Sequence, residues 1–189
     1  LIYSRTIEEY LLHLRKIQEV LRQHKLYAKM SKCAFCLPAV EYLGHLLSDV
    51  GISVEQTKVD AIKTWLGPRC KTDFQSFLGM VNFYRRFIMN CARILRPLTQ
   101  LTGNTPFTWD NKTQDAFESL KQALCTAPVL RTFDLKQPVV VTTDASGFAI
   151  GAVLEQDEDG FRRPVAYFSR TMNPHEQNFH AQEQELLPI

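Results

Sequence analysis

The sequence lacks a hydrophobic run long enough to cross a membrane. Its longest stretch without Asp, Glu, Lys or Arg covers 13 residues, 97–109, and is partly polar, whereas a spanning helix needs about 20 apolar residues. The amino-terminal segment also lacks the basic stretch followed by an apolar core that marks a signal peptide. We therefore expect an intracellular protein with no membrane partner.

Cysteine is too sparse for a disulfide-rich scaffold, and its number is odd. Five cysteines in 189 residues do not form the dense, paired framework of a small secreted protein, and they favour a reducing compartment. Cys33 and Cys36 form a C-x-x-C pair. A structural zinc site needs four ligands, however, and His45 has no second histidine or cysteine pair to complete one. Residues three apart in a strand also point to opposite faces, so the pair indicates ordinary apolar packing.

Several enzyme signatures are missing as well. The sequence contains no nucleophile motif, no glycine-rich phosphate loop and no dinucleotide-binding fingerprint. Its composition is that of a globular protein, with 45% apolar and 22% charged residues, which excludes a mostly disordered chain. The charge is uneven: residues 1–130 carry a net +6 and residues 131–189 a net −4. This asymmetry fits a polyanion-binding surface beside a carboxylate site, and chance explains it equally well.

The spacing of apolar residues predicts a helix-rich first part. Helices are expected over 6–24, 56–65, 72–88, 92–101 and 111–124, and β-rich segments over 26–28, 32–37 and 40–47. Thr6 is the predicted N-cap of the first helix, with Glu9 completing a capping box, and Thr72 is the predicted N-cap of the third.

The pattern changes between residues 128 and 137. Strands are expected over 138–143, 148–155 and 165–169, with a polar turn at 156–160. A helix is expected to begin near Pro174, because proline suits the first helical position. The chain therefore has the pattern of an α+β protein.

Asp144 is the strongest candidate for chemistry. It ends the apolar run 139–143 at a turn, where a carboxylate could bind Mg²⁺, which prefers oxygen ligands. The alternative is an Asx-turn. Glu183 and Glu185 lie on the last predicted helix and project about 200° apart, so only one could face Asp144. Glu185, beside the apolar pair 186–187, is the better partner, and an ordinary exposed glutamate is the alternative.

Arg85 and Arg86 lie in the aromatic stretch 83–87. Basic side chains beside aromatic rings can bind phosphate and stack on bases. The same aromatic spacing also fits an ordinary helical core, so both interpretations stay open.

Short motifs in a fixed order carry a family resemblance. They are YLGH at 42–45, SFLG at 76–79, NFYRRFI at 82–88, PLT at 97–99, FTW at 107–109, TDAS at 143–146, GAVL at 151–154, PVAYFSR at 164–170 and ELL at 185–187. Each motif is weak alone. The ordered set, which covers essentially the whole chain, resembles the Pol polyprotein of Ty3/gypsy-type LTR retrotransposons.

The resemblance implies a division of the chain. Residues 1–50 would be the end of a reverse transcriptase palm with a primer-grip-like hairpin, 51–130 a helical thumb and connection, and 131–189 the start of a ribonuclease H-like α/β domain. Leu43, Gly44 and His45 would grip the primer end. Nucleic acid would also contact Arg85, Arg86 and Ser146. The helices would hold a template–primer duplex mainly through phosphate contacts.

The resemblance also implies a nuclease site. Asp144 would be the first catalytic aspartate and Glu185 the catalytic glutamate, two of four carboxylates that hold two Mg²⁺ or Mn²⁺ ions for cleavage of RNA in an RNA–DNA hybrid. The polymerase aspartates would precede Leu1, and two nuclease aspartates would follow Ile189. Both sites would then be incomplete in this chain. Pro188 replaces the alanine usual in the family and would cost a helix interior about 3 kcal/mol.

Three hypotheses follow from this resemblance. The chain is part of a reverse transcriptase and ribonuclease H enzyme, joined to the protease and integrase of its Pol polyprotein in a cytoplasmic particle or in the nucleus. Alternatively, it is a catalytically inactive, nucleic-acid-binding remnant. The third hypothesis is a fragment with no stable role, whose truncated sheet exposes an edge.

Overall fold

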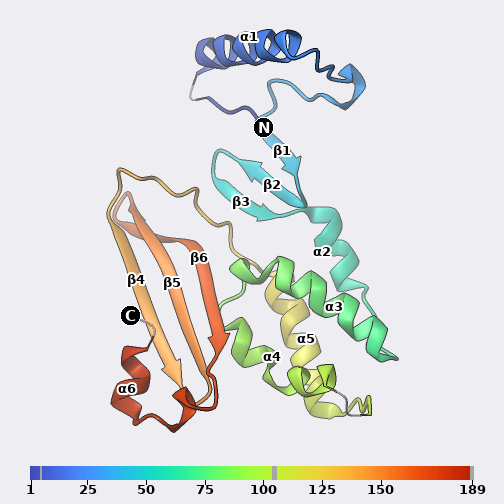
Figure 1. The fold of residues 1–189 in the computed structure, drawn as a ribbon, viewed down its shortest axis with the longest axis vertical. Helices are drawn as coiled ribbons and strands as arrows, with labels where there is room; N and C mark the ends of the chain where they lie inside the picture. The colour runs from blue at the N-terminus through green and yellow to red at the C-terminus, as the bar shows by residue number, and fades with distance from the viewer. Residues whose placement is uncertain (5, 104–105, 188–189) are drawn as a thin grey trace.

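The computed structural model describes residues 1–4, 6–103 and 106–187. The chain combines helices with two three-stranded antiparallel sheets, which confirms the predicted α+β class. Figure 1 shows helix α1 at one end, a helical bundle at the centre and the second sheet beside the bundle. Within the described residues, no helix is both long and apolar enough to span a bilayer.

Helix α1 (Ile7–Gln23) begins at the predicted cap. The Thr6 side chain accepts a hydrogen bond from the Glu9 backbone N–H at 3.2 Å. None of the helix's residues is buried, and Figure 1 shows it apart from the helical bundle. The apolar stripe predicted from the sequence is therefore present without a covering surface among the described residues. The large side chains of α1 that are exposed are Ile7, Leu11, Leu12, Ile17 and Val20.

The predicted strands at 26–28 and 32–37 are wrong. This region forms a short 3-10 turn, η1 (Met30–Lys32), and no partner strand lies beside it within the described residues. A strand needs such a partner, because its backbone N–H and C=O groups must be hydrogen-bonded.

The first sheet is a meander of β1 (Ala39–Tyr42), β2 (His45–Ser48) and β3 (Gly51–Val54). Leu130, which follows the last helix of the bundle, pairs with β3: Ile52 donates to its carbonyl at 2.7 Å, and Leu130 donates back to Ile52 at 2.8 Å. Gly51 permits this approach. Its φ is +137°, and a Cβ there would lie 2.2 Å from the Leu130 carbonyl oxygen.

The helical bundle holds the main core. Its elements are α2 (Gln56–Lys63), α3 (Lys71–Phe83), η2 (Arg85–Phe87), α4 (Cys91–Thr99), η3 (Gln100–Thr102) and α5 (Asn111–Cys125). The fully buried rings of Phe77 and Phe117 meet at 4.5 Å between centroids, and Phe74 packs beside them. Burial of each such side chain contributes about 1.5–3 kcal/mol. The bundle is thus a closed hydrophobic unit.

Two predicted boundaries in the bundle are wrong. Helix α3 starts one residue before Thr72 and has Cys70 as its N-cap, because Cys70 is the last residue with extended dihedrals. The helix ends at Phe83 instead of residue 88, since the backbone at Tyr84 (φ −95°, ψ 12°) leaves the α-helical region and continues as η2. Helix α5 is capped by Asp110 and Thr113 in a reciprocal capping box.

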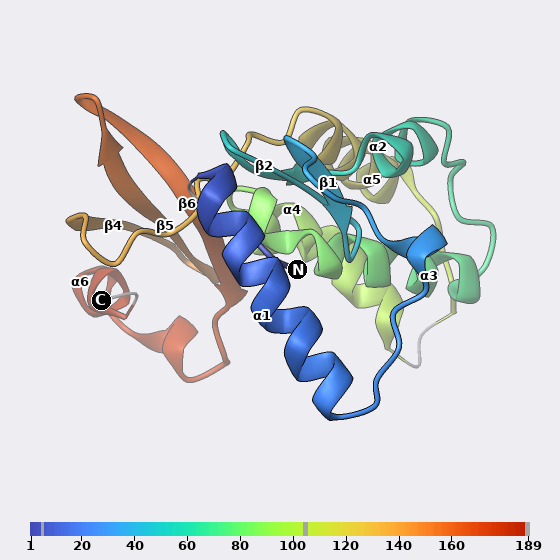
Figure 2. The same cartoon turned by 90° about the horizontal axis from the view of Figure 1, so that it is seen from above.

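The second sheet contains β4 (Val139–Ser146), β5 (Ala149–Glu158) and β6 (Phe161–Thr171), in that order. The predicted turn at 156–160 shortens to Asp159 and Gly160, because both residues have positive φ and close a two-residue hairpin. In Figures 1 and 2 this sheet lies between α4 and α6 (Ala181–Leu186).

The predicted helix start at Pro174 is wrong. The chain first forms the 3-10 turn η4 (Glu176–Asn178), and α6 begins only at Ala181. Glu176 explains the delay, because its carboxylate forms a two-point ion pair with Arg170 and also accepts from the Asn173 N–H. Pro188 lies outside the described residues.

Candidate functional site

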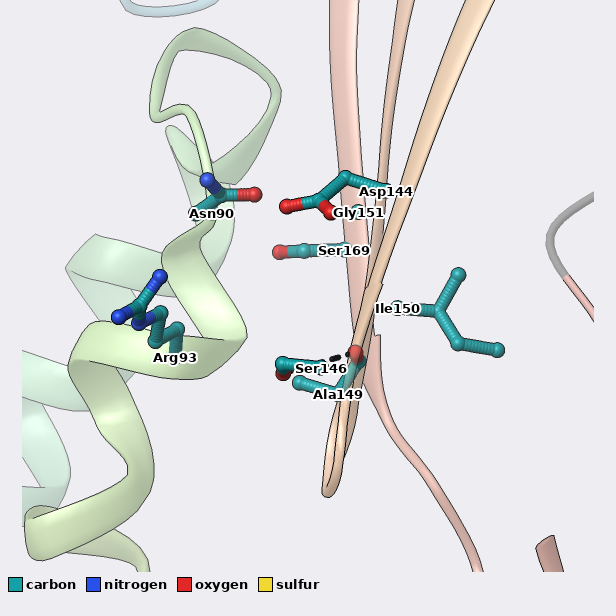
Figure 3. Close-up of a pocket in the computed structure, with 8 residues that line it drawn as sticks. All are labelled: Asn90, Arg93, Asp144, Ser146, Ala149, Ile150, Gly151 and Ser169. Atoms are coloured by element: carbon teal, nitrogen blue, oxygen red, sulfur yellow. Dashed lines mark hydrogen bonds between the residues drawn. The ribbon is translucent and has the colours of Figure 1, made fainter. Parts of the chain in front are cut away.

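A small pocket lies where α4 meets the second sheet (Figure 3). Asn90 and Arg93 line it from the helix side, and three strands supply the rest: Asp144 and Ser146 from β4, Ala149, Ile150 and Gly151 from β5, and Ser169 from β6. The pocket therefore joins the strongest sequence candidate to a helix that the sequence did not connect with it.

Asp144 lies within β4 rather than at its end. Ala145 and Ser146 continue the pairing with β5, and the turn follows at Gly147 and Phe148, so the predicted strand end at residue 143 is wrong by three residues. Asp144 pairs with Gly151, which in turn pairs with Ser169. Directly paired residues share a sheet face. Figure 3 shows the Asp144 carboxylate pointing toward Asn90, while Ile150 points to the opposite side of the sheet.

Ser169 holds the helix against this face. Its buried hydroxyl accepts a hydrogen bond from the Ala92 backbone N–H at 3.0 Å. Asn90, the N-cap residue of α4, has left-handed dihedrals and makes no side-chain cap bond. The backbone N–H groups in the first turn of a helix have no partner within the helix, and an N-cap side chain normally accepts a hydrogen bond from one of them. In this structure the acceptor is Ser169 of β6, which lies outside the helical bundle.

Arg85 and Arg86 also contact β6. An Nη2 of Arg85 donates to the Ser169 carbonyl, and an Nη2 of Arg86 donates to the Val165 carbonyl at 3.4 Å. Further along the junction, the Arg96 guanidinium lies 3.9 Å from the centroid of the Phe148 ring. Three arginines of the helical bundle thus hold the second sheet.

The carboxylates on α6 do not join Asp144 in this arrangement. Glu185 is exposed, and Glu183 accepts from the His180 N–H at 3.0 Å as part of the helix cap. Helix α6 lies on the side of the sheet away from α4 (Figures 1 and 2). Across the described ranges, no group of three or more His, Cys, Asp or Glu side chains could hold a metal, and this includes the region of Cys33 and Cys36.

The side chains near Asp144 carry the type of donor atom that divalent cations prefer, but they include too few carboxylates for two ions. The polar side chains that line the pocket include the Asp144 carboxylate, the Asn90 amide oxygen and the Ser146 and Ser169 hydroxyls. Mg²⁺ prefers such oxygen ligands. A pair of ions needs more than one carboxylate, and Asp144 supplies the only one lining this pocket. The described residues therefore do not form a two-ion site.

The predicted primer-grip hairpin forms a second candidate site. Leu43 and Gly44 make the two-residue turn between β1 and β2, with φ values of +49° and +78°. Leu43 is 71% exposed. The Tyr84 hydroxyl donates to the Gly44 carbonyl at 2.8 Å, so the end of α3 holds the turn.

His45 follows this turn and is half-buried. Its ring stacks on Phe83 at 5.2 Å between centroids and also meets Tyr84 and Phe87. Burial, aided by the positive charge of Arg86, lowers the pKa of His45 below its usual value. The imidazole therefore belongs to an aromatic cluster and is neutral near pH 7.

Sequence reasoning missed Ser169, Asn90 and Tyr84. Ser169 offered one signal, since it is a hydroxyl residue in an otherwise apolar strand segment, 165–169, and a buried hydroxyl requires a partner. Tyr84 entered the sequence analysis only as part of the aromatic stretch 83–87 and of the motif NFYRRFI at 82–88. Its bond to Gly44 connects residues 40 apart in the sequence, which no local pattern predicts.

Comparison with known proteins agrees with the resemblance found in the sequence. Residues 109–189 match the family described as the RNase H-like domain found in reverse transcriptase. The whole chain is 34% identical to part of a retrovirus-related Pol polyprotein from transposon opus of Drosophila melanogaster. It is 32% identical to part of the Transposon Tf2-3 polyprotein of Schizosaccharomyces pombe. The chain spans 20% and 14% of the lengths of these two relatives.

Solved structures show the same likeness. A foamy viral protease–reverse transcriptase in complex with RNA/DNA hybrid superposes with a TM-score of 0.86 and 26% identity, over 99% of this chain and 26% of that chain. The dRH form in complex with double-stranded DNA gives a TM-score of 0.87 and 26% identity, over 99% of this chain and 33% of that one. The chain belongs to the Pol polyproteins of retrotransposons, and its carboxyl-terminal part is an RNase H-like domain of the reverse transcriptase kind.

Proposed function

We propose that the polyprotein containing this chain synthesises DNA on an RNA template and hydrolyses the RNA strand of RNA–DNA hybrids, as in Ty3/gypsy-type elements. The observation that carries the proposal is the match of residues 109–189 to the RNase H-like domain of reverse transcriptases. The similarity over 99% of the chain to a foamy viral enzyme solved in complex with RNA/DNA hybrid supports the substrate class.

We assign three parts within this polyprotein. Residues 1–50 end the palm, 51–130 form the thumb and connection, and 131–189 begin the ribonuclease H domain. The separate sheet β4–β6 supports the boundary near residue 130. The proposed boundary at residue 50 falls within the first sheet, because β3 pairs with β2 across it. The rest of the polyprotein, including a protease and an integrase, would be the covalent partner of this chain.

Asp144 and Glu185 are the proposed ligands of Mg²⁺ or Mn²⁺ in the nuclease site. In a complete site, Mg²⁺ or Mn²⁺ held by these carboxylates would supply Lewis-acid activation of a water for phosphate hydrolysis. Asp144 contributes a carboxylate on a rigid strand with oxygen-bearing neighbours. Glu185 requires helix α6 to lie differently relative to the Asp144 face than it does here. Ser146 lies two residues from Asp144 on that face and remains a proposed nucleic-acid contact.

Leu43, Gly44 and His45 are the proposed contacts to the primer end. The exposure of Leu43 at the hairpin tip supports this role. Arg85 and Arg86 were also predicted to touch nucleic acid. Their guanidinium groups donate to carbonyls of β6, so we assign both to the junction between the bundle and the second sheet.

The decisive experiment is Asp144→Asn in the longer polyprotein. Cleavage of RNA in a hybrid should fall at least a hundredfold, while hybrid affinity changes less than threefold, because the amide keeps the side chain's size but not its charge. Asp159→Asn is the matched control, since Asp159 is exposed in a hairpin turn whose positive φ suits asparagine. Unchanged cleavage in Asp144→Asn would exclude the assignment.

A second candidate function is a nucleic-acid-binding remnant without chemistry. The position of α6, the helix that carries Glu185, on the side of the sheet away from α4 favours it. Its test is duplex binding by the unaltered polyprotein in increasing salt, with no cleavage in Mg²⁺ or Mn²⁺. Affinity that falls steeply with salt would support phosphate contacts, whereas undetectable binding would exclude this function as well.

A further inference from the structure

The hairpin turn at Leu43 and Gly44 has an unusual sequence for its geometry. Two-residue turns with positive φ at both positions normally contain Asn, Asp or Gly. Leucine rarely adopts φ near +49°, and at this position its side chain is 71% exposed. A strained, exposed apolar tip persists only where surrounding contacts hold it.

Those contacts come from the end of α3. The Tyr84 side chain is 3% exposed, and its hydroxyl donates to the Gly44 carbonyl at 2.8 Å. A Cβ added to Gly44 would lie 3.1 Å from that hydroxyl oxygen and 3.3 Å from the Phe83 ring. The hairpin and the helix are therefore in close contact at this point, and a larger residue at position 44 would press on Tyr84 and Phe83.

His45 forms the second contact. Its ring stacks on Phe83 with only 8° between the planes and meets the edge of Tyr84. The charged groups near this cluster are Arg86, which acts on His45, and Glu55, which acts on Tyr84. The Nδ1 atom of His45 is buried with no hydrogen-bond partner within the described residues, so a protonated ring would be poorly accommodated.

We propose that Tyr84 and His45 are positioning residues for primer binding: they fix the hairpin tip so that Leu43 meets the terminal nucleotide of the primer strand. The proposal rests on the proposed polymerase function. It adds Tyr84, which does not itself touch the nucleic acid, and it gives His45 a supporting role through the stacking of its ring. The bond to the Gly44 carbonyl fixes the height of the tip above α3, and the stacked imidazole fixes its angle.

The test is Tyr84→Phe in the complete polyprotein, with KM for a DNA primer on an RNA template as the readout. Loss of a single neutral hydrogen bond should raise this KM roughly threefold to tenfold. The kcat on saturating duplex and the KM for the nucleotide should stay within twofold. Tyr167→Phe is the matched control, because it removes a half-buried tyrosine hydroxyl on β6 and should leave the primer KM unchanged.

A second variant guards against a folding defect. Gly44→Ala places a methyl group against the Tyr84 hydroxyl and should raise the primer KM in the same direction. In the double variant the two effects should not add, because both act through one contact. An unchanged primer KM in both single variants overturns the proposal. So does an equal fall in RNA cleavage and primer use, since that result indicates a general structural role.

The His45 part has its own readout. As the pH falls through and below the usual imidazole range, protonation should release the ring from the cluster, so the primer KM should rise. His45→Phe keeps the stacked ring but cannot titrate, so in this variant the primer KM should no longer rise as the pH falls. If the primer KM of His45→Phe still rises at low pH, the proposed role of His45 is overturned. Absence of any DNA synthesis by the unaltered polyprotein would instead refute the underlying polymerase function, so the two failures are distinguishable.

Discussion

Replacing Ser169 by alanine tests whether the second sheet caps helix α4. The Ser169 hydroxyl is buried and accepts from the Ala92 N–H at 3.0 Å, while the N-cap residue Asn90 makes no such bond itself. Ser169→Ala leaves the strand pairing intact, because the backbone is unchanged. It removes only the acceptor, and the Ala92 N–H then stays in a buried junction without a partner.

The expected loss follows from two independent estimates. Deleting an N-cap oxygen costs about 0.5–2 kcal/mol, and leaving a buried donor unsatisfied costs about 1–3 kcal/mol. We therefore expect the free energy of unfolding to fall by roughly 1–2 kcal/mol. With a urea slope of about 2 kcal/mol per M for a chain of this size, the midpoint should fall by roughly 0.5–1 M.

Tryptophan fluorescence during urea unfolding measures this shift. Both tryptophans, Trp65 and Trp109, pack against the core of the helical bundle, whereas the altered residue lies in the sheet. A shift of the fluorescence midpoint would show that the sheet stabilises the bundle. Ser119→Ala is the control, since its exposed hydroxyl donates only within α5, to the Asp115 carbonyl. Equal midpoints for the two variants would refute the capping role.

Three further predictions concern stability and reactivity. Gly51→Ala should lower the free energy of unfolding by at least about 2 kcal/mol, because its Cβ would lie 2.2 Å from the Leu130 carbonyl oxygen; a midpoint within error of the unaltered chain in urea would contradict this. Hydrogen bonds from Arg170 hold the pKa of Glu176 at about 2, so the stability that this carboxylate provides is present above its ordinary pKa of 4.5 and lost as the pH falls toward 2. The destabilisation by Glu176→Gln should accordingly shrink between pH 6 and pH 2.5 in thermal melts, and a constant difference would argue against the ion pair. Burial raises the pKa of the Cys91 thiol to about 11, so at pH 8 it should react with a thiol reagent at least tenfold more slowly than the exposed Cys36 and Cys70, which mass spectrometry of labelled peptides can check.

Local patterns predicted most helices and the three strands of the second sheet, but the single β-rich segment at 40–47 is the hairpin β1–β2, and β3 was not predicted. Apolar spacing placed α1, α2, α4 and α5 within a few residues of their observed bounds, because an amphipathic helix has a period that a single segment reveals. The strands at 26–28 and 32–37 failed, because a β-branched or aromatic segment becomes a strand only beside a partner. The late start of α6 also depended on a contact, the ion pair between Arg170 and Glu176.

The candidate sites were less accessible to sequence reasoning. Asp144 could be singled out, because a carboxylate after an apolar run is unusual. Its neighbours could not, since Asn90 and Ser169 reach the pocket only through the docking of α4 on the sheet. The predicted pairing of Asp144 with Glu185 came from the place of Glu185 beside the apolar pair 186–187 and from the family resemblance, and it remains a prediction. The junction role of Arg85 could not be read from composition, because a guanidinium on a backbone carbonyl leaves no sequence signature.

The pairing of Ile52 with Leu130 has a consequence for protein engineering, because it brings together the two ends of the segment that contains the helical bundle. The chain enters and leaves the bundle through two residues that exchange backbone hydrogen bonds, so the ends of segment 52–130 adjoin. A segment with adjoining ends and its own closed core tolerates being cut out, joined end to end or inserted into another protein. The same geometry means that tension applied through the flanking sheets would be shared between this pair of hydrogen bonds and the bonds that Tyr84 and Arg85 make to the two sheets.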